Sequence, residues 1–174
     1  MKKIFLIVAL CAPWCVRGQD AAPMSEAEKV SEKAGVLVET EFVDVGTVKG
    51  VEVNQMIIKS LTDQSTVKAL RITYTKVSQY TSDTKISVLD KDEIDGLLLS
   101  LKQMQAMSNE GRDNYTEVTF KSRTGFKAGM YFEKKSAKWS GYLEVGRIAT
   151  ATAFLSMEDM VKFMGFVSAV KDKM

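Results

Sequence analysis

One capped, amphipathic pattern occurs twice in this chain, and it constrains the fold more than any other feature. The first copy runs from Leu89 to Met104 and the second from Leu155 to Val170. In both copies apolar residues recur at intervals of three and four, which places them on one side of an α-helix. The sequence therefore predicts two amphipathic helices, each entered from a strand and each needing a surface on which to bury its apolar side.

The residues at the start of the two predicted helices also correspond. Asp90 and Ser156 stand at the N-cap position, and Glu93 and Asp159 follow three residues later. An N-cap oxygen accepts a hydrogen bond from the first turn, and an acid three residues on can reach back to the N-cap N–H. We interpret the acids from Asp90 to Asp95 as a helix start, because they lack the glycine and ligand spacing of a calcium loop.

Strand patterns precede each predicted helix. Apolar and polar residues alternate over short segments, and turn residues separate these segments every 8–12 residues or so, which indicates antiparallel strands. We expect four strands and a helix over about 35–108 and the same order over about 112–174. This plan indicates an internal duplication of a β4-α unit, although the strand residues hardly match between the halves.

The predicted fold class is α+β, with mainly antiparallel β-sheet. Both apolar helix stripes can be buried if about eight strands form one curved sheet or partial barrel with the two helices against it. The alternative is two small sandwiches in tandem, each of which would be marginally stable without disulfides. A chain of 174 residues fits one compact domain, and we assign 35–174 to it, with 19–34 as a flexible N-terminal linker.

Residues 1–18 have the pattern of a signal peptide for export. Two lysines precede an apolar run over 4–12, and residues 16–18 resemble a small-residue cleavage site, so the mature chain is expected to start at Gln19. The apolar run is too short for a membrane span, which needs about 20 residues. The short positive start is typical of a bacterial export signal, so we expect a periplasmic or extracellular protein.

A lipid anchor is not expected. The candidate attachment sites are Cys11 and Cys15, and the residues before them are Leu10 and Trp14. Bacterial lipid-attachment signals usually have a small residue at that position.

The mature sequence excludes several classes of function. It contains neither cysteine nor histidine, which removes the thiol nucleophile, the thiolate metal site, and the commonest general base and metal ligand. Cleavage removes 3 of the 24 basic residues and none of the 22 acidic ones, so the net charge falls from +2 to about −1. We therefore expect no metal, no cofactor and no nucleic-acid surface, and we predict that the protein is not an enzyme.

Aromatic residues in the second half are the strongest indication of a binding site. Tyr131 and Tyr142 lie on adjacent predicted strands, and Arg123 and Arg147 stand at nearby turns. Such a group could stack sugars or anchor a protein partner, and the alternative is ordinary cross-strand pairing within the sheet. Trp139 shares the phase of apolar neighbours and is expected in the core.

These features together favour an exported, non-catalytic binding or interaction protein of the bacterial periplasm or cell surface. Its partner would be another protein or a small apolar or sugar ligand. Two alternatives remain open at this point: a structural subunit of an envelope assembly, and a hydrolase that uses carboxylates or a Ser-Lys pair.

Overall fold

The computed structural model describes residues 23–78, 81–147 and 149–174. The predicted signal peptide, its cleavage site and both cysteines lie outside the described residues. Where the chain is described, no helix is long and apolar enough to cross a membrane.

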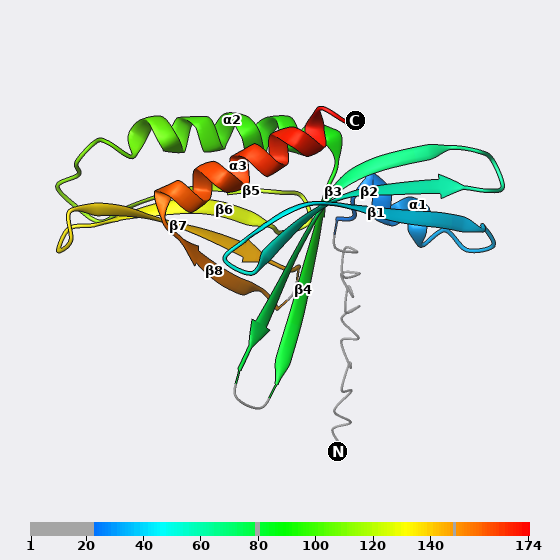
Figure 1. The fold of residues 1–174 in the computed structure, drawn as a ribbon, viewed down its shortest axis with the longest axis horizontal. Helices are drawn as coiled ribbons and strands as arrows, with labels where there is room; N and C mark the ends of the chain where they lie inside the picture. The colour runs from blue at the N-terminus through cyan, green and yellow to red at the C-terminus, as the bar shows by residue number, and fades with distance from the viewer. Residues whose placement is uncertain (1–22, 79–80, 148) are drawn as a thin grey trace, which may run out of the picture.

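Four strands followed by a helix occur twice, after a short N-terminal helix (Figure 1). The helices are α1 (Glu26–Ser31), α2 (Lys91–Met107) and α3 (Met157–Lys171). The first four strands are β1 (Val38–Val48), β2 (Val51–Ser60), β3 (Thr66–Val77) and β4 (Ser82–Leu89). The last four are β5 (Thr116–Lys121), β6 (Lys127–Glu133), β7 (Lys138–Val145) and β8 (Ala151–Leu155). The α+β class and the antiparallel strands are confirmed.

The eight strands form two sheets, so the prediction of one continuous sheet or partial barrel is wrong. The first sheet has the order β1-β2-β3-β4 and the second has the order β5-β6-β7-β8, with every neighbouring pair antiparallel. Each sheet is thus a meander of consecutive strands. The helix α2 separates β4 from β5 along the chain, and these two strands do not pair.

A single hydrophobic core joins the two helices to both sheets. In Figure 1, α2 and α3 lie side by side above β5–β8, while β3 and β4 extend away from the helices as an arm. The predicted stripe of α2 is fully buried, as are most of the corresponding residues of α3. The core takes Ile72 from the first sheet and Leu143 from the second, and the rings of Phe126 and Phe163 lie 6.3 Å apart within it. Trp139 is buried in the same core, as predicted.

The two helix starts are confirmed. Ser156 accepts a hydrogen bond from the N–H of Asp159 at 3.1 Å and donates its own N–H to the Asp159 carboxylate at 3.2 Å. In α2 the N–H of Asp90 donates to Glu93 Oε2 at 3.2 Å. Both helices therefore begin with a capping box, and the acids of the first turn also lie at the positive end of the helix dipole.

The carboxylate of Asp90 connects three elements that are far apart in sequence. It accepts hydrogen bonds from the N–H groups of Glu26, at 2.8 Å, and Ala27, at 3.4 Å, which belong to the first turn of α1. It also lies 3.5 Å from the guanidinium of Arg123, in the turn between β5 and β6. Because this carboxylate is buried, its charge is compensated by these partners and not by water.

The helix α1 differs from the flexible linker that we expected over 19–34. Ser25 and Ala27 are completely buried, and Ala27 packs with Met56, Ile58 and other apolar residues on the outer face of the first sheet. Six residues form a marginal helix alone. Here a capping box at Ser25 and the contact with Asp90 stabilise it.

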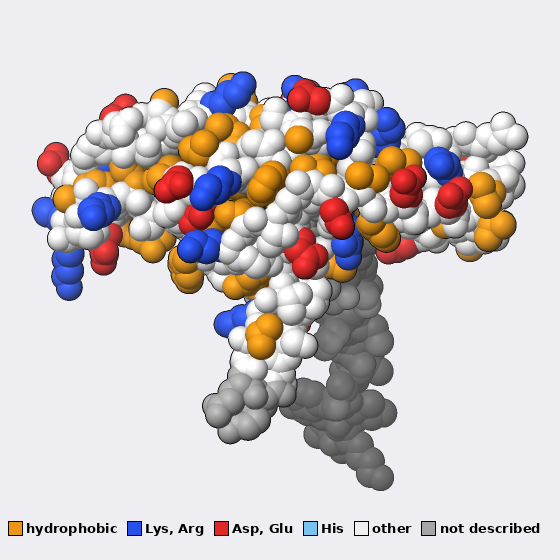
Figure 2. All heavy atoms as spheres, viewed as in Figure 1, with side chains coloured by type: hydrophobic (Ala, Val, Ile, Leu, Met, Phe, Trp, Pro, Cys, Tyr) orange, Lys and Arg blue, Asp and Glu red, His pale blue; other side chains and the backbone are white. Residues whose placement is uncertain are grey.

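The visible surface carries charges of both signs. Figure 2 shows lysine, arginine and acidic side chains interspersed over this face, with apolar side chains between them. This face has no broad patch of one charge.

We predict that Asp90→Ala lowers the free energy of unfolding by about 2–3 kcal/mol, because it leaves the first turn of α1 and Arg123 without a buried acceptor. Urea denaturation followed by circular dichroism measures this change. Asp92→Ala is the matched control: its side chain is 69% exposed and pairs with the same Arg123, so its loss should cost less than about 1 kcal/mol. Equal losses of unfolding free energy in the two variants would show that the Asp90 carboxylate is no more important for stability than that of Asp92.

Candidate binding site on the second sheet

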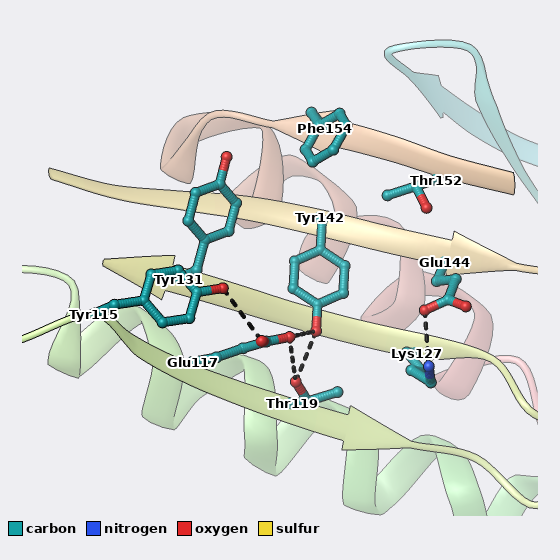
Figure 3. A pocket seen from close by; sticks show the side chains of 9 residues that line it. All are labelled: Tyr115, Glu117, Thr119, Lys127, Tyr131, Tyr142, Glu144, Thr152 and Phe154. Atoms are coloured by element: carbon teal, nitrogen blue, oxygen red, sulfur yellow. Dashed lines mark hydrogen bonds and ion pairs between the residues drawn. The ribbon is translucent and has the colours of Figure 1, made fainter. Parts of the chain in front are cut away.

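The outer face of the second sheet, on the side away from the helices, carries an open pocket of ≈ 490 Å³. Strand alternation explains its lining, because residues between the buried core positions of β6 and β7 must project from the opposite face. All four strands contribute. The lining residues are Tyr115, Glu117, Thr119, Lys127, Tyr131, Tyr142, Glu144, Thr152 and Phe154 (Figure 3).

The ring of Tyr142 lies flat across the neighbouring strand and forms the floor of the pocket. Tyr142 pairs with Gly129 in the β6–β7 register, and a Cβ atom on that glycine would lie 2.5 Å from the tyrosine hydroxyl. Glycine is therefore required under the ring. This position makes Tyr142 93% buried although it belongs to the outer face, since its relative exposure is only 7%.

The carboxylate of Glu117 is the polar centre of one side of the pocket. It accepts hydrogen bonds from the Tyr142 hydroxyl at 2.5 Å and from the Tyr115 hydroxyl at 3.3 Å. The Tyr142 hydroxyl also shares a hydrogen bond of 2.7 Å with the Thr119 hydroxyl. Burial and the hydrogen bond to Glu117 raise the pKa of Tyr142 to about 12, so this hydroxyl remains protonated at neutral pH.

A second carboxylate lies across the pocket and is held in its ionised form. Glu144 accepts hydrogen bonds from Thr150 at 2.6 Å and from Lys127 at 2.9 Å. These two contacts, the Thr150 hydroxyl first, lower the pKa of Glu144 below its usual value. The Lys127–Glu144 ion pair places one positive and one negative charge side by side at this end of the pocket.

Exposed aromatic rings form the rim. Tyr115 stacks on Tyr131 with ring centroids 6.3 Å apart and an interplanar angle of 27°. Tyr115 is 65% exposed, and Phe154 on the edge strand β8 is 67% exposed. The pocket thus combines apolar ring faces at its rim with hydroxyl and carboxylate groups at its floor, a composition typical of small-ligand sites.

The structure brings together only part of the predicted site. Tyr131 and Tyr142 line the pocket, but Arg123 and Arg147 do not. Arg123 donates to Asp92 at 2.6 Å and its N–H donates to Glu93 at 2.6 Å, so it holds the start of α2. Arg147 donates to the carbonyl of Pro23 at 2.6 Å and so holds the N-terminal segment.

Sequence reasoning missed seven of the nine lining residues, among them Tyr115, Glu117 and Phe154. The signal was present, because Glu117 shares the outward phase of Thr119 on β5, and Phe154 shares that of Thr152 on β8. Phase alone does not identify which strands are neighbours, so it could not place these side chains beside Tyr131.

The acidic group at the start of α2 is a weaker candidate for a functional site. Carboxylate oxygens of Asp90, Asp92 and Glu93 lie within 4.8 Å of one another, a separation that a metal ion could bridge. However, Arg123 contacts all three residues and supplies the compensating positive charge. We therefore assign this cluster to the stability of the fold.

Comparison with known proteins gives no lead to the function. No family model matches the chain, and no curated protein matches its sequence. The function must therefore be argued from the site itself.

The raised pKa of Tyr142 predicts a loss of stability at alkaline pH. In the unfolded chain this hydroxyl titrates near 10.0, whereas in the folded protein it titrates near 12, so between these values only the unfolded chain releases the proton. The free energy of unfolding therefore falls as pH rises through this window. In Tyr142→Phe, which keeps the ring over Gly129, this fall should be smaller.

Urea denaturation at several pH values from about 9 to 11.5 measures the slope for both proteins. A residual slope is expected in the variant, because desolvation and the charge of Glu117 also raise the pKa of Tyr115. Identical slopes in the wild type and in Tyr142→Phe would show that the Tyr142 proton is not linked to folding.

Proposed function

We propose that this chain is an exported, non-catalytic binding protein that binds a sugar on the outer face of its second sheet. One observation carries the proposal: exposed aromatic rings surround a floor of oriented hydroxyl and carboxylate groups. The volume of ≈ 490 Å³ lies within the range of small-molecule sites, about 300–1,000 Å³.

A sugar matches both parts of this surface. The C–H faces of a sugar ring are apolar and pack on aromatic rings, and Tyr131 and Phe154 offer such rings at the rim. The hydroxyl groups at the edge of a sugar both donate and accept hydrogen bonds. Glu117 and Glu144 can accept from them, and Lys127 can donate to them.

The state of the Glu144 carboxylate supports binding without catalysis. Glycoside hydrolysis uses two carboxyl groups, one of which must act as an acid with a raised pKa. The pKa of Glu144 is instead lowered by Thr150 and Lys127. The mature sequence also has neither histidine nor cysteine to serve as another base or nucleophile.

The repeated order of elements supports an origin by internal duplication of a β4-α unit. The two helices each follow four antiparallel strands and each begin with a capping box at the matching position. With this origin the two sheets would have diverged in use, because the proposed sugar site lies on the second alone.

Export predicts a defined N-terminus for the mature protein. When the full chain is expressed with its own signal in a bacterium, intact-mass measurement of the exported fraction should show a chain that starts at Gln19. A matched variant without residues 1–18 should remain in the cytoplasm. An exported protein that retains Met1, or one with added lipid mass at a cysteine, would contradict this prediction.

Sugar binding predicts a loss of affinity when the rim is truncated. A glycan array identifies ligands for the purified protein, and calorimetry with the strongest ligand then measures the dissociation constant. Phe154→Ala and Tyr131→Ala should each weaken binding by about tenfold, the effect of removing one buried aromatic contact from an interface.

Phe42→Ala is the matched control, because Phe42 is also an exposed phenylalanine, at 51%, but lies on the first sheet. It should bind the sugar as the wild type does. Equal losses in Phe154→Ala and Phe42→Ala, or the absence of any bound glycan, would overturn the sugar assignment. A protein that crosslinks to the wild type and not to Phe154→Ala would instead identify this face as a protein interface.

A further inference from the structure

A second polar cavity, of ≈ 290 Å³, lies on the first sheet at an irregularity of β1. Its lining residues are Asp44, Gly46, Thr47, Glu52 and Asn54. Apart from the glycine, these residues carry oxygen ligands: two carboxylates, one hydroxyl and one amide. The cavity is separate from the aromatic pocket, and nothing said about it depends on the proposed sugar site.

A β-bulge brings these side chains together. Asp44 pairs with Asn54, but the next pair joins Gly46 to Val53, so Val45 is an extra residue in β1. Val53 is buried toward the helices, and the neighbouring Asn54 must therefore project from the opposite face. Beyond the bulge Thr47 pairs with Glu52, so both pairs present their polar side chains on the outer face.

The bulge is held from the inner side by α3. A Cβ atom on Gly46 would lie 2.5 Å from ring atoms of Phe166, so only glycine allows this contact. The backbone that carries Asp44 and Thr47 is thus fixed by the core. Bulges are frequent beside functional sites, because they redirect side chains from a regular sheet.

Asn54 supplies the observation that points to a ligand. Its side chain is 95% buried, since its exposure is only 5%, and its Nδ2 donates to Asp44 Oδ1 at 2.5 Å. Its Oδ1 has no hydrogen-bond partner among the described residues. Buried carbonyl oxygens are rarely left without a partner, so this oxygen keeps an unmet capacity to interact with a hydrogen-bond donor or a cation.

The charge of the cavity favours a cation as that group. Among the described residues neither Asp44 nor Glu52 forms an ion pair, in contrast to the acids at the start of α2, which Arg123 neutralises. Arg71, which pairs with Asn54 on the neighbouring strand, stacks its guanidinium over the ring of Phe42 at 4.8 Å.

We propose that this cavity binds a calcium ion. Calcium takes six to eight oxygen ligands and accepts irregular geometry, whereas nitrogen and sulfur ligands, which this cavity lacks, favour zinc and other transition metals. Asp44 and Glu52 supply carboxylate oxygens, Asn54 supplies its amide oxygen, and Thr47 supplies its hydroxyl. Water completes the coordination.

Calcium titration of the chelator-treated full-length mature protein tests the proposal. Calorimetry should give a dissociation constant of about 10⁻⁴–10⁻³ M, the range of weakly charged extracellular sites, and calcium should raise the melting temperature. The double variant Asp44→Asn/Glu52→Gln should bind at least about tenfold more weakly. Its amides keep the shape of the cavity, and its melting curve without calcium verifies that it folds.

Glu39→Gln/Glu41→Gln is the matched control, because it removes the same two charges from exposed positions on β1. It should bind calcium as the wild type does. Equal weakening in both double variants, or an equal effect of magnesium, would overturn the proposal.

A second test monitors the side chain of Asn54 directly and leaves Asp44 and Glu52 unchanged. In two-dimensional NMR spectra, the side-chain NH₂ signals of Asn54 should shift during the calcium titration, with assignment by the Asn54→Asp variant. Unchanged Asn54 signals while other residues respond would place calcium elsewhere and overturn the site.

Discussion

The two amphipathic helices must bury their apolar sides, and the rest of the structure depends on how they do so. The helices α2 and α3 pack against each other and on the inner faces of both sheets, which gives one core in place of two small ones. Neither half could reach this burial alone, because a unit of this size without disulfides hides too little of its apolar surface. The shared core thus explains how two separate sheets form one folded body.

This arrangement leaves the outer faces of the sheets for binding. On the first sheet α1 covers part of that face, held there by the buried carboxylate of Asp90 and by a small apolar cluster around Ala27. On the second sheet Tyr115 and Phe154 remain exposed. A large aromatic residue that stays exposed is a better indication of a binding surface than one that packs in the core, because packing already explains the presence of the buried one.

The sequence predicted the local features of the fold and failed at the long-range ones. The stripe that contains Leu97 and the cap at Asp90 were found because helix periodicity and capping need only neighbours in sequence. Whether β4 would pair with β5 depends on the packing of the whole chain, and here the prediction of one sheet was wrong. The helix α1 was taken as a linker because its main partner, Asp90, is remote in sequence.

The candidate site shows the same division between local features, which the sequence predicted, and long-range ones, which it did not. Tyr131 and Tyr142 were found because they lie on adjacent predicted strands. The burial of Tyr142, however, depends on Gly129 in the neighbouring strand, and only the register reveals that pair. Arg123 stands at a turn, as expected, but a long charged side chain can reach either side of a sheet. Its direction is set by the acids at the start of α2.

Two groups of acids illustrate why composition alone does not identify a site. The three acids at the start of α2 are close together in sequence and in space, but Arg123 and the N–H groups of α1 already satisfy them. Asp44 and Glu52 are separated by a hairpin and form no motif, yet they meet beside a buried amide oxygen that has no partner among the described residues. A binding site is identified by unmet charge and unmet hydrogen-bonding capacity, and both depend on partners that only the folded chain brings together.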